Sequence, residues 1–442
     1  MASICIAGEW HQAVVVGACL ADLGHDVRGA IVDERTAEQL RAGVPPVHEP
    51  ELPELMSRGL ESGSLRYTTS FEDALRGADY AYIALDTPIA DDDTPELDDV
   101  VATARRIAAS LSGGIVLVVT AQVPVGTCER LRDLLAAGSG HRVSVAHVPE
   151  FLRLGQAVRT FMDADRFIIG CDEEGVAEAL AAVYAPLGRP VLQMGLRSAE
   201  MAKHASNAFL AASISFTNEI ADLCAEVGAD IGAVTQGMKL DRRIGQHAFL
   251  GAGLGFAGGT LGRDLRALQE LGRAHGRATH MVDAVIGVNR SRSGLVRHEL
   301  ERAYGEVAGL RVGVLGLTYK PGTSTLRRSI ALEIIADLDA AGAQVVAYDP
   351  LADMTELSDP PRFERVADPA AAAAGADALV LVTEWDGLDD VDPGELRARM
   401  RRPLFIDTRN YFDPAAMAAH GFTYAGVGRG AAAERSTAAE AV

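Results

Sequence analysis

The sequence lacks the long apolar runs, the basic patches and the leader features of membrane, nucleic-acid-binding or secreted proteins. Its longest apolar stretches, such as residues 115–121, fall far short of the roughly 18 residues that a membrane span needs. Lys and Arg number 41 against 61 Asp and Glu, a formal net charge of −20 that opposes nucleic acid and anionic membranes. No secretory pattern opens the chain, so we expect a cytoplasmic protein.

Cysteine is scarce as well, with five in 442 residues. The number is odd and the positions are widely spaced, mostly inside apolar runs, so we expect reduced core thiols and no disulfides. Nor do His11, His204 and His247 have a second ligand at metal spacing, so no metal site is predicted.

What is present is an alternation of short β-type apolar runs and longer helical segments, which is typical of parallel sheets covered by helices. The pattern runs from Ser3 to about residue 195 and restarts at Leu310. Between them, a segment without Gly or Pro extends from Ser198 to Gly228 and predicts one long helix. We therefore predict an α/β protein with two doubly wound Rossmann-like domains joined by a long central helix.

The predicted domains are an N-terminal doubly wound domain, a central helical domain, a C-terminal doubly wound domain and a tail. Their respective bounds are 1–195, 196–305, 306–425 and 426–442. The tail has low complexity and is expected to be disordered. The long helix carries apolar residues on more than one face, which predicts packing against both doubly wound domains or against a second subunit. A homodimer through this segment is our hypothesis.

Seven separated motifs lie in order along the chain. They are Val148-Pro-Glu-Phe-Leu-Arg, Lys203 with Asn207, Asp241-Arg-Arg-Ile-Gly245, Gly253 to Gly259 with Asp264, Gly316-Leu-Thr-Tyr-Lys-Pro321, Tyr348-Asp-Pro350 and Asp407-Thr-Arg-Asn410. Together they resemble the UDP-glucose, GDP-mannose and UDP-N-acetylmannosamine dehydrogenases. The resemblance implies an NAD-dependent oxidation of a sugar alcohol, through an aldehyde, to a carboxylate. It also implies that the N-terminal domain is dinucleotide-binding-like and the C-terminal domain nucleotide-sugar-binding-like.

The cofactor loop departs from the family. Where a dinucleotide fingerprint reads G-x-G-x-x-G, this chain reads Gly8-Glu9-Trp10-His11-Gln12-Ala13, so an indole replaces the second glycine. Ile31 occupies the position of the acid that binds the ribose. Asp33 can substitute for that acid if the strand end shifts, whereas Arg35 would instead favour a 2′-phosphate. The cofactor is therefore predicted as NAD, with NADP or no cofactor left open. The candidate cofactor-binding residues are Gly8, Trp10, Asp33, Thr87, Pro88, Gln122 and Arg327.

The family's nucleophilic cysteine is also absent, because Thr260 follows Gly258-Gly259. A hydroxyl is a much weaker acid than a thiol, so the covalent route to a carboxylate is closed. Lys203 and Asn207 are four residues apart and project from one face of the predicted helix, which suits stabilisation of an oxyanion or proton transfer. The resemblance implies that the candidate catalytic residues are Lys203, Asn207, Asp264, Glu150 and Thr260; Glu150 can equally be a structural acid capping the following turn.

The nucleotide-sugar pocket matches the family better. By resemblance, the candidate substrate-binding residues are Phe151, Leu152, Arg243, Phe249, Leu250, Gly253, Phe256, Gly258, Gly259 and Lys320. We predict a divergent enzyme acting on a nucleotide sugar or related nucleoside by two-electron or redox-neutral, NAD-assisted chemistry such as epimerisation or elimination. A cofactor-free lyase, epimerase or hydrolase, and a non-catalytic nucleotide-sugar-binding protein, are the alternatives.

Overall fold

The computed structural model describes residues 1–85, 96–138, 140–257, 259–357 and 359–429. The chain divides into two compact units, residues 1–206 and 207–442. Within the described ranges, no helix combines the length and apolar character needed to cross a membrane. The same residues contain no group of three His, Cys, Asp or Glu side chains suited to hold a metal ion.

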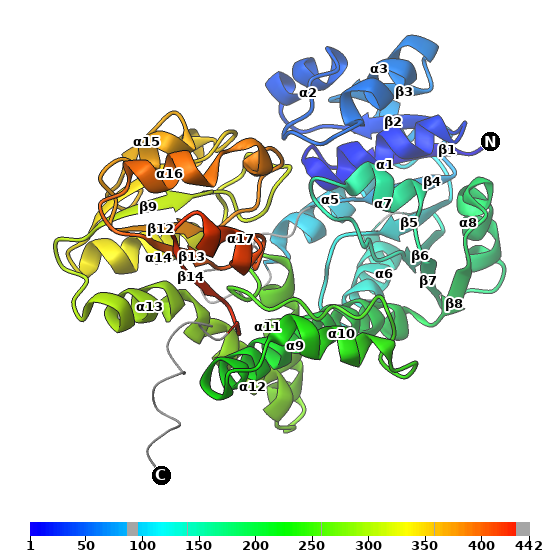
Figure 1. Cartoon of the computed structure of the whole chain (residues 1–442). Helices are drawn as coiled ribbons and strands as arrows, with labels where there is room; N and C mark the ends of the chain where they lie inside the picture. The colour runs from blue at the N-terminus through cyan, green and yellow to red at the C-terminus, as the bar shows by residue number, and fades with distance from the viewer. Residues whose placement is uncertain (86–95, 139, 258, 358, 430–442) are drawn as a thin grey trace. The chain divides into compact units, whose positions relative to one another are not determined.

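The first unit is built on an eight-stranded sheet in the order β3-β2-β1-β4-β5-β6-β7-β8 (Figure 1). The strands are β1 Ser3–Ala7, β2 Asp26–Ala30, β3 Leu65–Thr68, β4 Tyr80–Ile83, β5 Ile115–Val119, β6 Val143–His147, β7 Phe167–Cys171 and β8 Val191–Met194. Neighbouring strands are parallel apart from β6 and β7, which are antiparallel. The first six follow the strand order of a dinucleotide-binding fold.

Helices cover both faces of this sheet because its strands are apolar on both sides. In β1, Ile4 and Ile6 belong to one buried cluster, while Cys5 and Ala7 belong to another on the opposite face. The helices are α1 His11–Asp22, α2 Glu34–Arg41, α3 Leu52–Ser62, α4 Phe71–Leu75, α5 Asp98–Ala109, α6 Thr127–Gly138, α7 Ala157–Met162 and α8 Val176–Tyr184, followed by a 3₁₀ turn at Ala185–Leu187.

Helix α9, Leu196–Val227, begins in the first unit and ends in the second. Its 32 residues make it about 48 Å long at 1.5 Å per residue. The second unit continues with α10 Ile231–Leu240, α11 Thr260–Ala274, α12 His280–Ser291 and α13 Leu295–Tyr304, with a 3₁₀ turn at Arg292–Gly294.

The second unit also contains a parallel six-stranded sheet in the order β11-β10-β9-β12-β13-β14 (Figure 1). Its strands are β9 Arg311–Leu315, β10 Gln344–Tyr348, β11 Glu364–Arg365, β12 Ala378–Leu381, β13 Leu404–Asp407 and β14 Thr423–Gly426. Its helices are α14 Ile330–Ala340, α15 Pro369–Ala373, α16 Pro393–Arg399 and α17 Pro414–Ala419, with 3₁₀ turns at Met354–Glu356 and Leu388–Asp390.

The predicted fold class is confirmed: two doubly wound sheets are present, and one long helix lies between them in sequence. The start of the predicted tail differs, because Gly426 ends β14 and Val427 is buried against Ala221, Cys224 and Ile231. Residues 430–442 of that tail lie outside the described residues. The division into three domains stays a prediction.

Candidate functional site

The glycine loop joins β1 to α1. Gly8 has φ of +151°, and a Cβ added there would lie 2.5 Å from the Ala84 carbonyl oxygen. The first glycine of the fingerprint is therefore required by the backbone itself. Trp10 caps α1 with φ of −107° and ψ of −173°, an extended conformation that any residue adopts. The loop thus fits a dinucleotide at Gly8 and departs from that pattern at the Trp10 side chain.

A carboxylate of the loop reaches the end of β2. One oxygen of Glu9 accepts hydrogen bonds from the backbone N–H groups of Val32, at 3.0 Å, and Asp33, at 3.1 Å. Ile31 is fully buried in the core of the first unit. The candidate cofactor residue Asp33 caps α2, where hydrogen bonds from the Thr36 backbone and hydroxyl hold the pKa of the Asp33 carboxyl below its usual range.

A buried carboxylate absent from the sequence prediction supports the same loop. Glu49 is fully buried and accepts hydrogen bonds from His11 Nε2, at 2.6 Å, and from the backbone of Gly155 and Ala157, both at 2.8 Å. Burial would raise the pKa of the Glu49 carboxyl, but these hydrogen bonds hold it below its ordinary value. Glu49 therefore ties the start of α1 to the segment that follows the Val148-to-Arg153 motif.

The remaining candidate cofactor residues are scattered. Gln122 is buried after β5, where the neighbouring Thr120 accepts two hydrogen bonds from Gln12. Arg327 is exposed in the loop between β9 and α14 of the second unit. Thr87 and Pro88 lie outside the described residues.

The first cluster of candidate catalytic residues is formed by Lys203 and the Val148-to-Arg153 motif. Lys203 Nζ donates to the Glu150 carbonyl oxygen and lies 3.6 Å from its carboxylate, and it stands 4.7 Å from the centre of the Phe151 ring. The side chain is 4% exposed, so this cation is buried and paired. Glu150 also accepts from the Leu152 backbone at 2.6 Å, so it caps the following turn and faces Lys203 at once.

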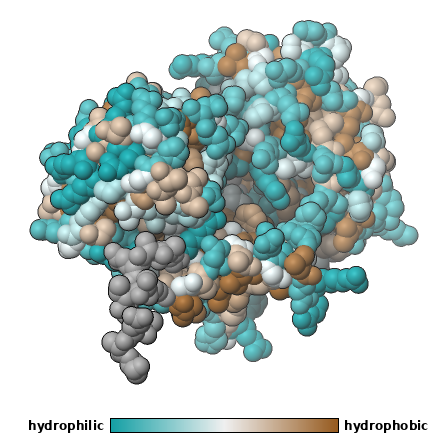
Figure 2. All heavy atoms as spheres, viewed as in Figure 1, coloured by the Kyte–Doolittle hydropathy of each residue, from teal (hydrophilic) through white to brown (hydrophobic). Residues whose placement is uncertain are grey.

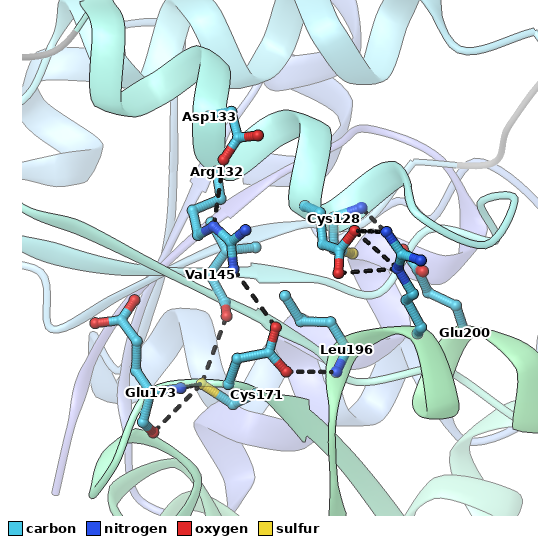
Figure 3. Close-up of polar contacts among 11 residues, drawn as sticks. Cys128, Arg132, Asp133, Val145, Cys171, Glu173, Leu196 and Glu200 are labelled. Atoms are coloured by element: carbon cyan, nitrogen blue, oxygen red, sulfur yellow. Dashed lines mark hydrogen bonds and ion pairs between the residues drawn. The ribbon is translucent and has the colours of Figure 1, made fainter.

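The first turns of α9, which position Lys203, are fixed within the first unit. Glu200 is fully buried and accepts a hydrogen bond from the Gly126 backbone. It also accepts one from the backbone of Cys128, at the start of α6, at 2.8 Å (Figure 3). The Leu196 backbone donates to Asp172 after β7, and Arg197 pairs with Glu129 of α6 at 2.6 Å. These contacts fix the orientation from which α9 presents Lys203.

Two histidines flank that lysine. His204 Nε2 lies 2.9 Å from the Val123 carbonyl oxygen. His147, the last residue of β6, is buried. Burial lowers the pKa of the His147 imidazole to about 3, so the ring is neutral at physiological pH.

The second cluster lies in the second unit, where the Asn207 amide of α9 donates to the Asp264 carboxylate of α11. Both side chains are buried. Thr260 is the first residue of α11 and is exposed, one helical turn before Asp264. The chain contains no thiol at this helix start, since the sole cysteine of the second unit is Cys224, buried in α9.

The glycine-rich loop before α11 is held by two buried polar side chains, Asn218 and Arg292, and by half-buried Asn289, none of which the sequence prediction named. Asn218 accepts from the Gly253 backbone at 2.8 Å, and Asn289 exchanges hydrogen bonds with the Phe256 backbone at 2.8 and 2.9 Å. Arg292, paired with Asp222, donates to the Gly253 carbonyl at 3.2 Å. In the sequence, the only indication of this role was that Asn218 and Asn289 stand among apolar residues of helical segments. The loop is therefore shaped by its supports as well as by its glycines.

The other candidate substrate residues differ in exposure. Arg243 is exposed and paired with Asp241 at 2.6 Å, Phe249 is exposed and Leu250 is buried. Gly259 caps α11, Lys320 is half-buried near the Tyr319 ring, and Gly258 lies outside the described residues. In the same motif as Lys320, the backbone N–H groups of Leu317 and Thr318 donate to buried Asp349, which also accepts from Trp385 Nε1, at 2.7 to 3.0 Å.

The structure therefore assembles Lys203, Glu150, Phe151 and Leu152 in the first unit, and Asn207 with Asp264 in the second. A doubly wound domain with a glycine loop, a second doubly wound domain and a helix carrying buried Lys and Asn define the class of two-domain nucleotide-binding Rossmann proteins.

Comparison with known proteins makes this class specific. Three domains of the UDP-glucose/GDP-mannose dehydrogenase family match in order: the NAD binding domain at residues 2–188, the central domain at 197–291 and the UDP binding domain at 313–414. The chain belongs to this family. The predicted resemblance and the assignment to an oxidoreductase family are confirmed.

Individual relatives cover nearly the whole chain. UDP-glucose 6-dehydrogenase of Pseudomonas aeruginosa is 38% identical over 441 residues, covering 96% of this chain and 97% of the relative. UDP-glucose 6-dehydrogenase TuaD of Bacillus subtilis is 36% identical, with 97% and 94% covered. The structure of a UDP-glucose dehydrogenase from Pyrobaculum islandicum superposes with a TM-score of 0.89 at 36% identity, covering 97% of this chain and 98% of that one.

Proposed function

We propose that this chain acts on a nucleotide sugar or related nucleoside by NAD-assisted two-electron or redox-neutral chemistry, such as epimerisation or elimination. Four-electron oxidation to a uronate is not the reaction that we propose. The observation that supports this choice is the buried Lys203 and Asp264, each with its partner, combined with a threonine at position 260. Acid and base groups are thus retained without a covalent nucleophile.

Each of these residues is suited to proton transfer by its own surroundings. The Lys203 ammonium, held between the Glu150 carbonyl and carboxylate, can stabilise an oxyanion or donate a proton to it. The Asp264 carboxylate, oriented by Asn207, can accept a proton. If the hydride taken from the sugar is returned to it, the net reaction is redox-neutral.

The cofactor would be held by the Gly8 loop and the N-terminus of α1, with Gln122 beside it. When bound, NAD supplies hydride transfer with the carbon that carries the hydroxyl. The cofactor-free alternative is favoured by one observation, the Trp10 indole at the position where the pyrophosphate of a dinucleotide passes.

The test is the stoichiometry of NADH and product with UDP-glucose and related nucleotide sugars. We expect zero or one NADH per product molecule. With substrate deuterated at the reacting carbon, the deuterium should appear in the reduced cofactor when one NADH is formed, and in the product when the hydride is returned. Lys203→Met should abolish the reaction, while the matched control Lys239→Met, in α10, should retain it. Two NADH per uronate would refute the proposal, and product formed without any bound NAD would favour the cofactor-free alternative.

We also propose a homodimer, supported by the apolar surface of α9. Phe209, Phe216 and Leu223 recur every seven residues and are exposed, as is Val227. Apolar side chains gather along the lower edge of the view in Figure 2, in the region of α9, α10 and α12. A stripe of this kind suits isologous packing against a second copy of the helix.

A further inference from the structure

In this chain, the carboxylate that lies at the end of β2 comes from the glycine loop and not from the strand, unlike in other dinucleotide-binding folds. There, an acid of the strand itself binds the adenosine ribose. Here the corresponding Ile31 is fully buried in the core, and Asp33 binds Thr36. Glu9, from the glycine loop, is instead anchored to the backbone N–H groups of Val32 and Asp33.

Two adjacent N–H groups at a strand end are a natural anion site. In this chain the anion is a side chain of the protein, at 3.0 and 3.1 Å from the two nitrogens. A ligand phosphate directed to the same pair would have to displace the Glu9 carboxylate and would be repelled by it. A 2′-phosphorylated ribose is therefore disfavoured, even though Arg35 lies two residues beyond Asp33.

A ribose with free hydroxyls should be attracted by the Glu9 carboxylate, where a phosphate would be repelled. The 2′- and 3′-hydroxyls are donors, and a fixed carboxylate is the strongest neutral-pH acceptor for them. We propose that Glu9 replaces the missing strand acid, binds the 2′,3′-diol of an unphosphorylated adenine dinucleotide and rejects the 2′-phosphorylated class. This inference rests on the proposed use of NAD and deepens it, because it assigns cofactor choice to one residue.

The chain provides a reporter next to this residue. Trp10 follows Glu9 directly and is 37% exposed, so its fluorescence should respond to a nucleotide bound at the loop. The other of the two tryptophans, Trp385, is buried in the second unit with its indole N–H bonded to Asp349. Comparison with Trp10→Phe identifies the part of the signal that comes from the loop.

The experiment measures binding, not turnover. NAD⁺, NADP⁺ and ADP-ribose are titrated into the full-length wild type, Glu9→Gln, Asp33→Asn and Glu34→Gln by calorimetry, with Trp10 fluorescence as a second readout. Glu9→Gln keeps an oxygen for the two N–H groups and removes the charge. Glu34→Gln makes the same change on a neighbouring carboxylate, which faces Arg41 and Thr69.

We expect the wild type to bind NAD⁺ and ADP-ribose at least about tenfold more tightly than NADP⁺, since a charged hydrogen bond contributes about that factor. Glu9→Gln should weaken NAD⁺ binding by about the same factor and reduce the preference over NADP⁺. Asp33→Asn and Glu34→Gln should leave the preference in place.

Several results would overturn the inference. The wild type could bind both dinucleotides with equal affinity, or Glu9→Gln could bind NAD⁺ as tightly as wild type or more tightly. The preference could be lost in Asp33→Asn instead, or neither wild type nor any variant could bind a dinucleotide. Failure of the proposed function is separate, because absence of turnover on nucleotide sugars would leave these binding constants unaffected.

Discussion

Replacing Glu49 by Gln tests whether one buried carboxylate holds the loops around the candidate cofactor site. One Glu49 oxygen accepts from both His11 and Gly155, and the other accepts from Ala157. In the best orientation of the glutamine amide, its oxygen keeps the first two bonds and its NH₂ group faces the Ala157 N–H. At least one hydrogen bond to a charged group is then lost, a cost of about 1.5–3 kcal/mol.

That cost is a large part of the roughly 5–15 kcal/mol by which domains are stable. We expect a lower urea midpoint for Glu49→Gln at neutral pH, read by Trp10 fluorescence and by circular dichroism. Midpoints are compared rather than a single unfolding free energy, since a two-unit chain need not unfold in one step. The control is Glu54→Gln on the exposed side of α3, with an expected change within about 0.5 kcal/mol.

The stabilisation by Glu49 should depend on pH in a direction that follows from the pKa of its carboxyl. Hydrogen bonds hold the pKa of folded Glu49 below its unfolded value despite burial, so its contribution is complete above the unfolded pKa and is lost as the pH falls through the folded pKa. Glu49→Gln should therefore differ most from wild type near neutrality and converge with it in acid. Equal midpoints for Glu49→Gln and Glu54→Gln at pH 7 would refute the reasoning.

Three further predictions concern other residues. The pKa of buried His147 is about 3 and that of an unfolded histidine is about 6.5, so the unfolded chain binds this proton first. The free energy of unfolding should therefore fall by up to about 1.4 kcal/mol per pH unit as the pH falls from about 6.5 to 3. In urea titrations at pH 7 and pH 5, His147→Leu should show a smaller difference than wild type. Phe216→Glu should convert a dimer into a monomer by light scattering, whereas wild type of monomeric mass would contradict the dimer. Gly8→Ala should lower the thermal midpoint and, through its strained φ alone, cost about 1–3 kcal/mol; an unchanged midpoint would contradict the close approach to Ala84.

The sequence was sufficient for the fold class because apolar periodicity marks strands that are buried on both faces. The apolar stretch at residues 115–121 contains β5, and the segment without Gly or Pro from Ser198 lies in α9, but no pattern marked β3 or β8. Strand β3 has only four residues, and β8 is largely exposed and lacks a continuous apolar pattern. The antiparallel pairing of β6 with β7 was also missed, since periodicity carries no information on strand direction.

The residues of the candidate site could be predicted where helical spacing or the order of motifs identified them, as for Lys203 and Asn207. It was not predictable where partners are distant in sequence. Glu49 lies 38 residues from His11 and 106 from Gly155, and Asn218 lies 35 from Gly253. Glu9 was visible as a negative charge in the loop, but its backbone partners depend on how β1 and β2 are aligned.

The burial of the native cysteine thiols has a practical consequence for chemical labelling. Cys5, Cys19, Cys128 and Cys224 are buried and Cys171 is half-buried. Burial raises the pKa of the Cys5 thiol to about 12 and also raises the pKa of the Cys19 thiol. Alkylating reagents that attack thiolates should therefore leave the folded wild type largely unmodified. A cysteine introduced at exposed Thr260, where the N-terminus of α11 favours the thiolate, would be a single-site attachment point for a spectroscopic probe.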